Sequence, residues 1–313
     1  MRKSMGIILE KYQLRKSKKQ KNEFIGWLRE YLSSYDYDLT EDKYSKSGTN
    51  IIVGDVDSAE VILTAHYDTQ PNFFMPVLMG FSNWFFFFIS QLLILVPMAL
   101  IFEIGRIIFK AIFGNGIMYA ILMPIPLWLY LIQIFVGIAN RHTANDNTSG
   151  VTTLISILED MPPEERHKVC VVFFDQEELG MIGSGSFKNK YKKASKSKPL
   201  INFDCVSDGE TLTFVMKKKF KVSENAALLK KASDKAILGS SKKSRFADAF
   251  WNIYTSDQII FPNSVGVVAA KKAPVLGYYI DRLHSRWDTK FDNENIELLS
   301  RTMIEFVRTI ESI

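Results

Sequence analysis

Hydrophobic residues along the chain form two kinds of pattern, helical stripes and short continuous runs. Residues 22–35 place Phe24, Leu28 and Leu32 at helical spacing, which predicts an amphipathic helix packed against a core. Short runs rich in β-branched residues predict strands at TNIIVGDV, AEVILTAH, HKVCVVFFD, PLINFDCV, TLTFVMK, VGVVAA and PVLGYYI. Further helices are predicted over NTSGVTTLISILEDM, over EELGMIGSGSFKNKY, near residues 223–237, and from about 293 to 312.

The order of these elements predicts the fold class. Most of the predicted strands are apolar throughout, as expected for strands that are buried on both faces of a sheet. They alternate with helices along the chain, which is typical of an α/β fold: a mostly parallel sheet with helices on both faces. No internal repeat is visible in the sequence.

Residues 69–140 interrupt this pattern with two long apolar segments. Residues 69–102 and 111–140 contain no charged side chain, and each segment exceeds the roughly 20 residues that cross a bilayer. We therefore predict a transmembrane helical hairpin at 69–140, with spans at about 73–102 and 112–139. It would divide one α/β domain into residues 1–68 and 141–313. The alternatives are two helices buried in a large core, or a hydrophobic dimer interface.

Charge suggests how such a hairpin would be oriented. The segment before the first span is long and strongly basic, so the positive-inside tendency predicts a cytoplasmic catalytic domain and cytoplasmic termini. The segment EIGRIIFK, residues 103–110, would then form the loop on the far side. Arg106 and Lys110 in that loop argue against this orientation.

The remaining composition excludes several classes of protein. Lysine clusters at residues 15–21, 188–198 and 217–221 fit either an anionic lipid surface or ordinary solvated faces, and the net charge is +5. They show neither interleaved exposed aromatic residues nor a known nucleic-acid-binding fold, so no nucleic-acid partner is expected. Cys170 and Cys205 lie in apolar runs and predict buried thiols. The N-terminal apolar run is too short for a cleaved secretory signal.

Candidate ligand residues follow the predicted strands. In an open α/β sheet the ligand site lies at the carboxyl ends of the strands, so these side chains are expected to converge. A single carboxylate there is more often a helix cap, and we assign His142 and His167 to ordinary surface or core positions. The recurrence at five points favours a metal site built from His66, Asp68, Asp146, Glu177, Glu178, Asp204 and His284.

The order of these motifs resembles a known family. H-x-D, then NDNTSG before a helix, then E-E, then Asp after a strand, then a late His in HSRWDT are similar to the co-catalytic zinc exopeptidases. These are aminopeptidases of the bacterial secreted leucyl-aminopeptidase and aminopeptidase Y type. The segment SDQIIFPNSVGVV also resembles that family, with Gln258 where His is usual. The apolar hairpin departs from it.

The resemblance implies a role for each residue. Asp146 would bridge two metal ions, with His66 and Asp204 on one and Glu178 and His284 on the other. Asp68 would orient His66 through a hydrogen bond, and Glu177 would be the general base. Imidazole and carboxylate ligands suit Zn²⁺, with Co²⁺ or Mn²⁺ as substitutes. The implied reaction is hydrolysis of an N-terminal peptide bond, and membrane-associated peptides would be suitable substrates.

Three other functions remain open. A relative of glutaminyl cyclase would use this type of scaffold with one zinc ion, although the complete ligand set favours two. An inactive receptor or scaffold protein would ordinarily have lost ligands, and none is missing here. Carboxypeptidase or dipeptidase specificity is also compatible, since the metal motifs do not say which end of a substrate is recognised.

Overall fold

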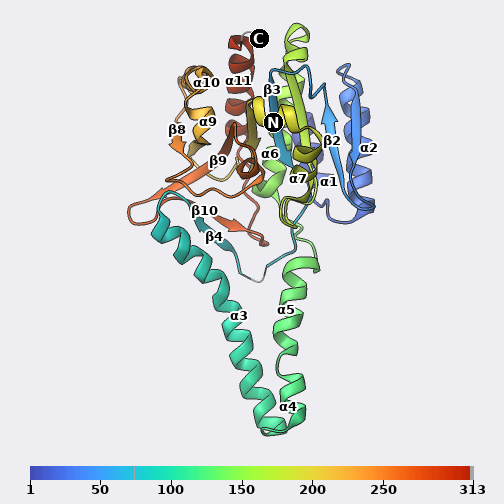
Figure 1. The fold of residues 1–313 in the computed structure, drawn as a ribbon, viewed down its shortest axis with the longest axis vertical. Coiled ribbons are helices and arrows are strands. Elements are labelled where there is room, and N and C mark those ends of the chain that lie inside the picture. The colour runs from blue at the N-terminus through green and yellow to red at the C-terminus, as the bar shows by residue number, and fades with distance from the viewer. Residues whose placement is uncertain (74, 311–313) are drawn as a thin grey trace.

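The computed structural model describes residues 1–73 and 75–310, which form an α/β domain with a projecting helical hairpin (Figure 1). The strands are β1 (Leu39–Lys43), β2 (Thr49–Val53), β3 (Val61–His66), β4 (Val77–Gly80), β5 (Val169–Phe174), β6 (Leu200–Phe203), β7 (Thr211–Met216), β8 (Lys243–Asp248), β9 (Ser264–Ala273) and β10 (Gly277–Leu283). The helices are α1 (Lys3–Lys11), α2 (Lys18–Ser33), α3 (Trp84–Phe113), α4 (Ile117–Leu122), α5 (Ile125–Val136), α6 (Gly150–Asp160), α7 (Ile182–Lys190), α8 (Lys192–Ser197), α9 (Lys218–Lys221), α10 (Glu224–Ala236) and α11 (Asn293–Thr309). Short helical segments are η1 (Ala144–Ser149), η2 (Pro163–Lys168) and η3 (Asp257–Ile260).

The strands form one mixed sheet in the order β1-β2-β5-β3-β6-β9-β10-β4, and β7 joins β8 to β9. The central strands β5, β3, β6 and β9 are parallel to one another. Antiparallel pairing occurs toward the edges, where β2 meets β5 and where β10 meets β9 and β4. The predicted α/β class is confirmed, with parallel pairing in the centre of the sheet and between β7 and β8.

Side chains of the central strands alternate between two buried layers. On β5, Val171 and Phe173 pack into the core beneath α1, α2, α6, α10 and α11. Cys170 and Val172 point to the opposite face, where they meet residues of α7 and α8. Successive side chains on a strand face opposite ways, so apolar residues throughout a strand indicate helices on both sides. Figure 1 shows these two helical layers.

The hairpin of α3, α4 and α5 stands outside this core. Both arms are long and apolar enough to cross a membrane, and the most apolar stretch of each is only 6% buried. Figure 1 shows the arms meeting near α4 and separating toward the domain. The alternative of two helices buried in a protein core is therefore wrong for the described residues.

The insertion differs in detail from the predicted spans. Its first helix begins at Trp84 and continues through Glu103 and Arg106, which pair on its surface at 2.7 Å. The expected loop at 103–110 is therefore wrong. The chain turns at Gly114 instead, whose φ of 63° suits a glycine at a helix end.

The root of the insertion also belongs to the sheet. Strand β4 pairs with β10, although the sequence pattern placed all of residues 69–140 outside the sheet. Its run of four residues is too short to stand out from a longer apolar segment. Helix α1 and strands β1 and β8 were likewise not predicted. The expected end of the last helix near residue 312 lies outside the described residues.

Candidate metal centre

The structure brings the predicted ligand residues together at one end of the central strands. His66 is the last residue of β3, and Asp204 directly follows β6. The two glutamates lie just beyond β5, and His284 directly follows β10. Asp146 lies in η1, which leads into α6. His142 and His167 belong to none of the clustered groups of candidate ligands in the described chain.

Two groups of side chains meet at Asp146. One of its carboxylate oxygens, Oδ1, lies 3.3 Å from Nε2 of His66, and that nitrogen is 3.5 Å from Oδ1 of Asp204. Its other oxygen, Oδ2, lies 3.2 Å from Nε2 of His284, which is 3.6 Å from Oε2 of Glu178. Each group offers one imidazole and two carboxylates within 4.8 Å, and Asp146 is shared between them.

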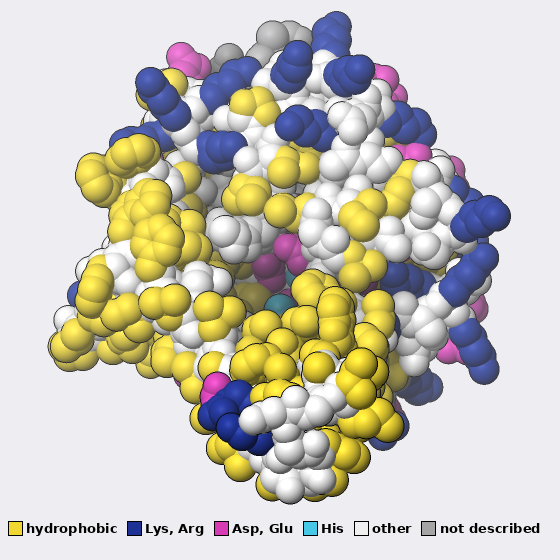
Figure 2. All heavy atoms as spheres, turned by 60° about the horizontal axis from the view of Figure 1, so that its bottom comes forward, with side chains coloured by type: hydrophobic (Ala, Val, Ile, Leu, Met, Phe, Trp, Pro, Cys, Tyr) yellow, Lys and Arg dark blue, Asp and Glu magenta, His cyan; other side chains and the backbone are white. Residues whose placement is uncertain are grey.

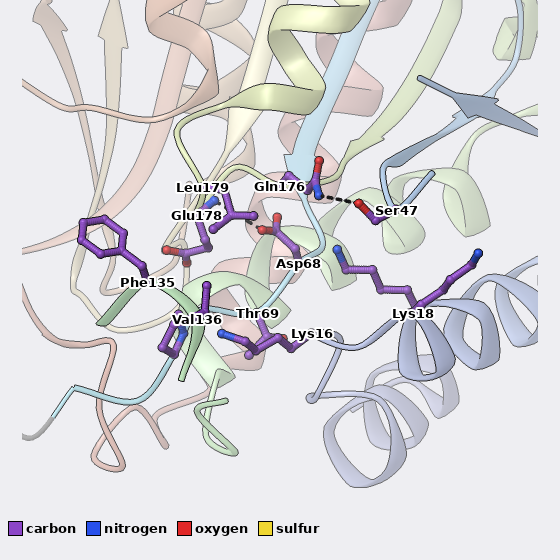
Figure 3. Close-up of a pocket in the computed structure, with 12 residues that line it drawn as sticks. Lys16, Lys18, Ser47, Asp68, Thr69, Phe135, Val136, Gln176, Glu178 and Leu179 are labelled. Carbon is purple, nitrogen blue, oxygen red and sulfur yellow. Dashed lines mark hydrogen bonds between the residues drawn. The ribbon is translucent and has the colours of Figure 1, made fainter. Parts of the chain in front are cut away.

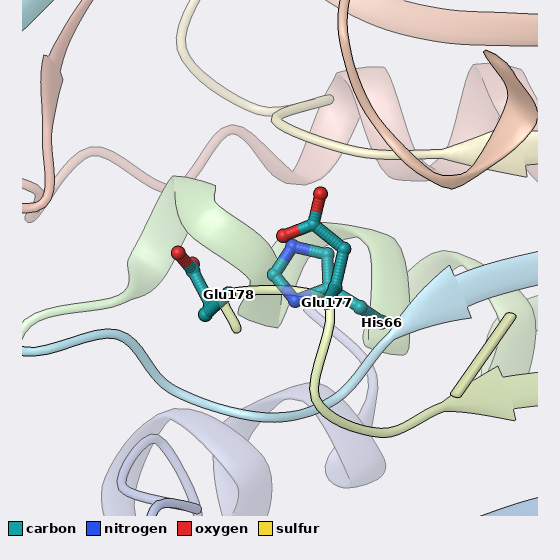
Figure 4. A group of neighbouring side chains, drawn as sticks. All are labelled: His66, Glu177 and Glu178. Carbon is teal, nitrogen blue, oxygen red and sulfur yellow. The ribbon is translucent and has the colours of Figure 1, made fainter. Parts of the chain in front are cut away.

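The adjacent glutamates point in different directions. Figure 4 shows the side chain of Glu178 set apart to one side, while that of Glu177 overlaps the ring of His66 in this view. Their backbone is fixed by Asp68, whose two carboxylate oxygens accept the N–H groups of Glu177 at 3.1 Å and Glu178 at 3.3 Å. Asp68 was expected to accept a hydrogen bond from His66, but its Oδ1 lies 3.5 Å from Nδ1 of that histidine. The main observed contacts of Asp68 are those with the Glu-Glu backbone.

Hydrogen bonds hold the loop that carries Asp146 against the strand ends. Asn147 donates to the carbonyl oxygen of Phe203 at 3.0 Å, which ties the loop to β6. Asp288 accepts the backbone N–H groups of Asn145 at 2.8 Å and Asp146 at 2.9 Å. A polar loop can be buried only when its backbone groups are paired in this way. Asp288 belongs to the HSRWDT motif, in which sequence reasoning gave a role to His284 alone.

A buried arginine links two of the segments that carry candidate ligands. Arg15 is fully buried, donates from Nε to the carbonyl oxygen of Tyr67 at 2.5 Å, and contacts the hydroxyl of Thr148 at 3.3 Å. It thus joins the end of β3 to the loop of Asp146. Lys21 is also buried and pairs with Asp175. The basic cluster at residues 15–21 is therefore partly interior, which its charge pattern alone did not indicate.

Electrostatics in the site are dominated by carboxylates. Burial lowers the pKa of His66, but Asp146, Asp204 and Asp68 outweigh it, so the pKa lies well above the ordinary value. Burial raises the pKa of Glu177, opposed by His66 and reinforced by nearby carboxylates. Burial and neighbouring carboxylates likewise raise the pKa of Glu178. The site therefore contains more carboxyl groups than its two histidines can balance if all of them ionise.

This donor set fits a divalent metal ion. In the described part of the chain, no Lys or Arg forms an ion pair with Asp146, Glu178 or Asp204. Oε1 of Glu178 is buried and has no hydrogen-bond partner among the described residues. Clustered, buried carboxylates need a compensating cation. Imidazole and carboxylate groups are ligands that zinc takes in catalytic sites.

Sequence reasoning missed one acidic residue beside this cluster. Asp257 is fully buried at the start of η3, and neither of its carboxylate oxygens has a hydrogen-bond partner in the described structure. Burial raises its pKa to about 7, and its charge interacts with His66, Asp68 and Asp204. Its signal in the sequence is the SDQIIF segment, which resembles the family, although that resemblance was not used to assign a role to Asp257. The neighbouring Gln258 instead donates to the carbonyl oxygen of Tyr254 at 2.9 Å.

Comparison with known proteins agrees with this architecture. The model of Peptidase family M28 matches residues 135–310, more than half of the chain, so the chain belongs to peptidase family M28. That match includes Asp146, Glu177, Glu178, Asp204 and His284. The family supports a zinc-dependent metallopeptidase-like protein, as expected from the sequence. No curated protein matches this chain.

Several solved structures share the fold along nearly the whole chain. Glutaminyl cyclase of Bacteroides thetaiotaomicron, bound to N-acetylhistamine, is 14% identical, with a TM-score of 0.60 and coverage of 98% of this chain and 96% of that one. Glutaminyl cyclase of Tannerella forsythia is 15% identical, with a TM-score of 0.57 and 98% coverage of both chains. The LapA aminopeptidase of Legionella pneumophila is 12% identical, with a TM-score of 0.58 and coverage of 99% and 70%. The fold thus matches cyclases and an aminopeptidase about equally well.

Proposed function

We propose that this chain is a membrane-embedded zinc aminopeptidase with a two-metal centre. The observation that carries the proposal is the position of Asp146, whose two carboxylate oxygens face different histidines at 3.3 and 3.2 Å. A carboxylate shared in this way suits a bridging ligand. His66 and Asp204 would hold one ion, and Glu178 and His284 the other. Bound zinc would supply Lewis acidity and lower the pKa of water.

Two acidic residues outside the proposed ligand set would transfer the proton and position the base. Glu177 belongs to neither of the two groups that share Asp146, although it clusters with His66 and Glu178, and we assign it as the general base. It would take a proton from the attacking water and pass it to the departing amine. The peptide C–N bond is broken while the water oxygen joins the carbonyl carbon. Asp68 would keep Glu177 in position through the backbone of the Glu-Glu pair.

The hairpin would anchor this enzyme in a bilayer. Its exposed apolar helices support a two-span membrane protein, with the catalytic domain and both termini proposed to be cytoplasmic. Exposed aromatic residues next to the hairpin fit an interfacial position, since Phe250 and Trp251 are 66% and 63% exposed. The loop that carries them is hydrogen-bonded to the segment just before the hairpin, since the N–H of Ile253 donates to the carbonyl oxygen of Phe81. Peptides associated with the membrane would be the substrates.

A second candidate is a glutaminyl cyclase-like enzyme with one zinc ion, held by Asp146, Glu178 and His284. It is supported by the coverage of at least 96% of both chains in the likeness to two glutaminyl cyclases. The two activities give different products from a peptide with N-terminal glutamine. Hydrolysis releases free glutamine and a shortened peptide, whereas cyclisation releases ammonia and keeps the peptide length.

The experiment incubates the zinc-loaded protein with peptides that begin with Gln or Leu, and identifies the products by mass spectrometry. We expect loss of the first residue from both peptides. Ammonia loss from the Gln peptide with an intact Leu peptide would replace the aminopeptidase proposal by the cyclase. A Leu peptide with an acetylated N-terminus is the control and should stay intact.

A further inference from the structure

The hairpin contributes directly to the pocket beside the metal centre. A cavity of about 180 Å³ is lined by Asp68 and Glu178 together with Phe135 and Val136, the last two residues of α5. Figure 3 shows these α5 residues next to Glu178, with Lys16 below the two carboxylates and Lys18 on the far side of Asp68. One wall of this pocket beside Asp68 and Glu178 is therefore supplied by the segment that we propose to lie in the membrane.

The segment that leads into the hairpin reaches the same metal group, since Glu178 and His284 belong together. Phe73 precedes β4 and packs edge-on against the ring of His284, with ring centres 4.9 Å apart. Its backbone N–H also donates to the carbonyl oxygen of His284 at 2.6 Å. Phe73 lines a second, mostly apolar cavity of about 180 Å³ between α3 and α5, together with Val77, Leu93 and Tyr130. Phe73 thus lies between this apolar cavity and the candidate ligand His284.

The two segments that connect the hairpin to the domain, residues 70–72 and 138–140, are hydrogen-bonded to each other next to the site. The N–H of Asn72 donates to the carbonyl oxygen of Ile138 at 2.8 Å, and the N–H of Asn140 donates to that of Gln70 at 3.0 Å. The side chain of Gln70 reaches the carbonyl oxygen of Asp146 at 3.5 Å. These bonds hold the hairpin in a defined position relative to the metal centre, which a flexible tether would not do.

The face that carries the hairpin is also the face on which the site opens. Figure 2 looks at this face and shows acidic and histidine side chains at the bottom of a hollow bordered by hydrophobic side chains. An apolar border of this size indicates contact with a hydrophobic partner or a membrane.

We infer that the substrates are hydrophobic polypeptide segments that reach the metal centre laterally from the bilayer, past the domain-proximal end of α5. This inference rests on the proposed aminopeptidase function and adds the route of the substrate and the α5 residues that it contacts. The apolar part of the substrate contacts Phe135 and Val136 while its free N-terminal residue lies at the metal centre. The bilayer concentrates such substrates along the hairpin and so raises the rate at which they reach the site.

The test compares two peptides that share one short polar N-terminal sequence with a free amine. In the first peptide, about twenty Leu and Ala residues follow, enough to cross a bilayer. The second peptide ends after the polar sequence. Zinc-loaded protein is reconstituted in vesicles of phosphatidylcholine with a minor fraction of phosphatidylglycerol, and kcat/KM is measured for both peptides.

Phe135→Ala and Phe85→Ala form a matched pair of variants. Both phenylalanines lie at the domain-proximal ends of hairpin helices and are 60% and 63% exposed, but only Phe135 lines the catalytic pocket. We expect Phe135→Ala to lower kcat/KM for the membrane peptide about tenfold more than for the short peptide, because an apolar contact is lost. Phe85→Ala should change neither value, and Phe135→Leu should restore most of the loss.

Each other result has a defined meaning. Equal kcat/KM of the wild-type protein for the two peptides, or equal losses in the two alanine variants, would overturn the lateral route and leave the aminopeptidase proposal intact. Cleavage of neither peptide by zinc-loaded wild-type protein would overturn the proposed function, and the inference with it.

Discussion

The sheet domain and the hairpin are both built from hydrophobic residues, but they bury them in different ways. In the domain, Leu63 and Phe173 are completely enclosed by strands and helices of the same chain. In the hairpin, Leu92 and Leu100 are 61% and 55% exposed. Hydrophobicity alone therefore does not say what covers a side chain. The domain supplies its own apolar environment, and the hairpin requires one from outside, which we propose to be a bilayer.

Polar groups show the same contrast. At the carboxyl ends of the strands, the domain buries Asp146, Asp204 and Asp257, each of them no more than 6% exposed. The hairpin carries its few charges on the surface of α3, where Glu103 and Arg106 pair with each other. Burying carboxylates is costly unless they are compensated, so their concentration at one site indicates function. The two regions meet at this site, where Phe135 and Phe73 approach the candidate ligands.

The largest effect that we expect in the domain comes from Glu177→Gln. Replacing the general base with an amide of nearly the same shape should lower kcat by about 10² to 10⁴-fold. The zinc content, measured by inductively coupled plasma mass spectrometry, should stay unchanged, because Glu177 is not assigned as a ligand. Glu164→Gln on the exposed η2 segment is the control and should retain full activity. Loss of zinc in Glu177→Gln would mean that Glu177 and Glu178 have exchanged roles.

Two leucine substitutions sharpen the comparison of the two regions. Leu63→Ala should destabilise the domain by about 2–5 kcal/mol, since it opens a cavity in a closed core. Leu100→Ala, on the exposed surface of α3, should change stability by less than about 0.5 kcal/mol. The midpoint of thermal unfolding in detergent micelles, which cover the hairpin, measures both. Similar shifts for the two variants would show that the hairpin is packed against protein after all.

The alternation of apolar strands and helices was sufficient to predict the α/β class, because both faces of β3, β5 and β6 are buried. Edge strands were harder to predict. Strand β1 has the sequence LTEDK and only one buried residue, so its place depends on pairing with β2. Strand β4 is short and apolar within a longer apolar segment, and only its pairing with β10 distinguishes it from the helix that follows.

The candidate ligands could be chosen from the sequence because each one follows a recognisable strand or precedes a helix. Their supporting residues could not. Arg15 lies in a lysine-rich segment typical of a solvated surface, and its burial follows from carbonyl groups at Tyr12 and Tyr67 that tertiary packing brings near. Asp288 and Asp257 act through contacts with residues far away in the chain. The wall formed by Phe135 depends on where the hairpin returns to the domain.

The number of bound zinc ions tests the two-metal centre most directly. Purified protein would be stripped with a chelator, reloaded with Zn²⁺, and its bound metal counted together with that of His66→Ala and His284→Ala. We expect two ions per wild-type chain and preferential loss of one ion in each variant, because Asp146 joins two separate groups. A single ion in the wild-type protein that persists in His66→Ala would contradict the two-metal centre and favour the cyclase-like alternative. No bound zinc at all would contradict the catalytic account.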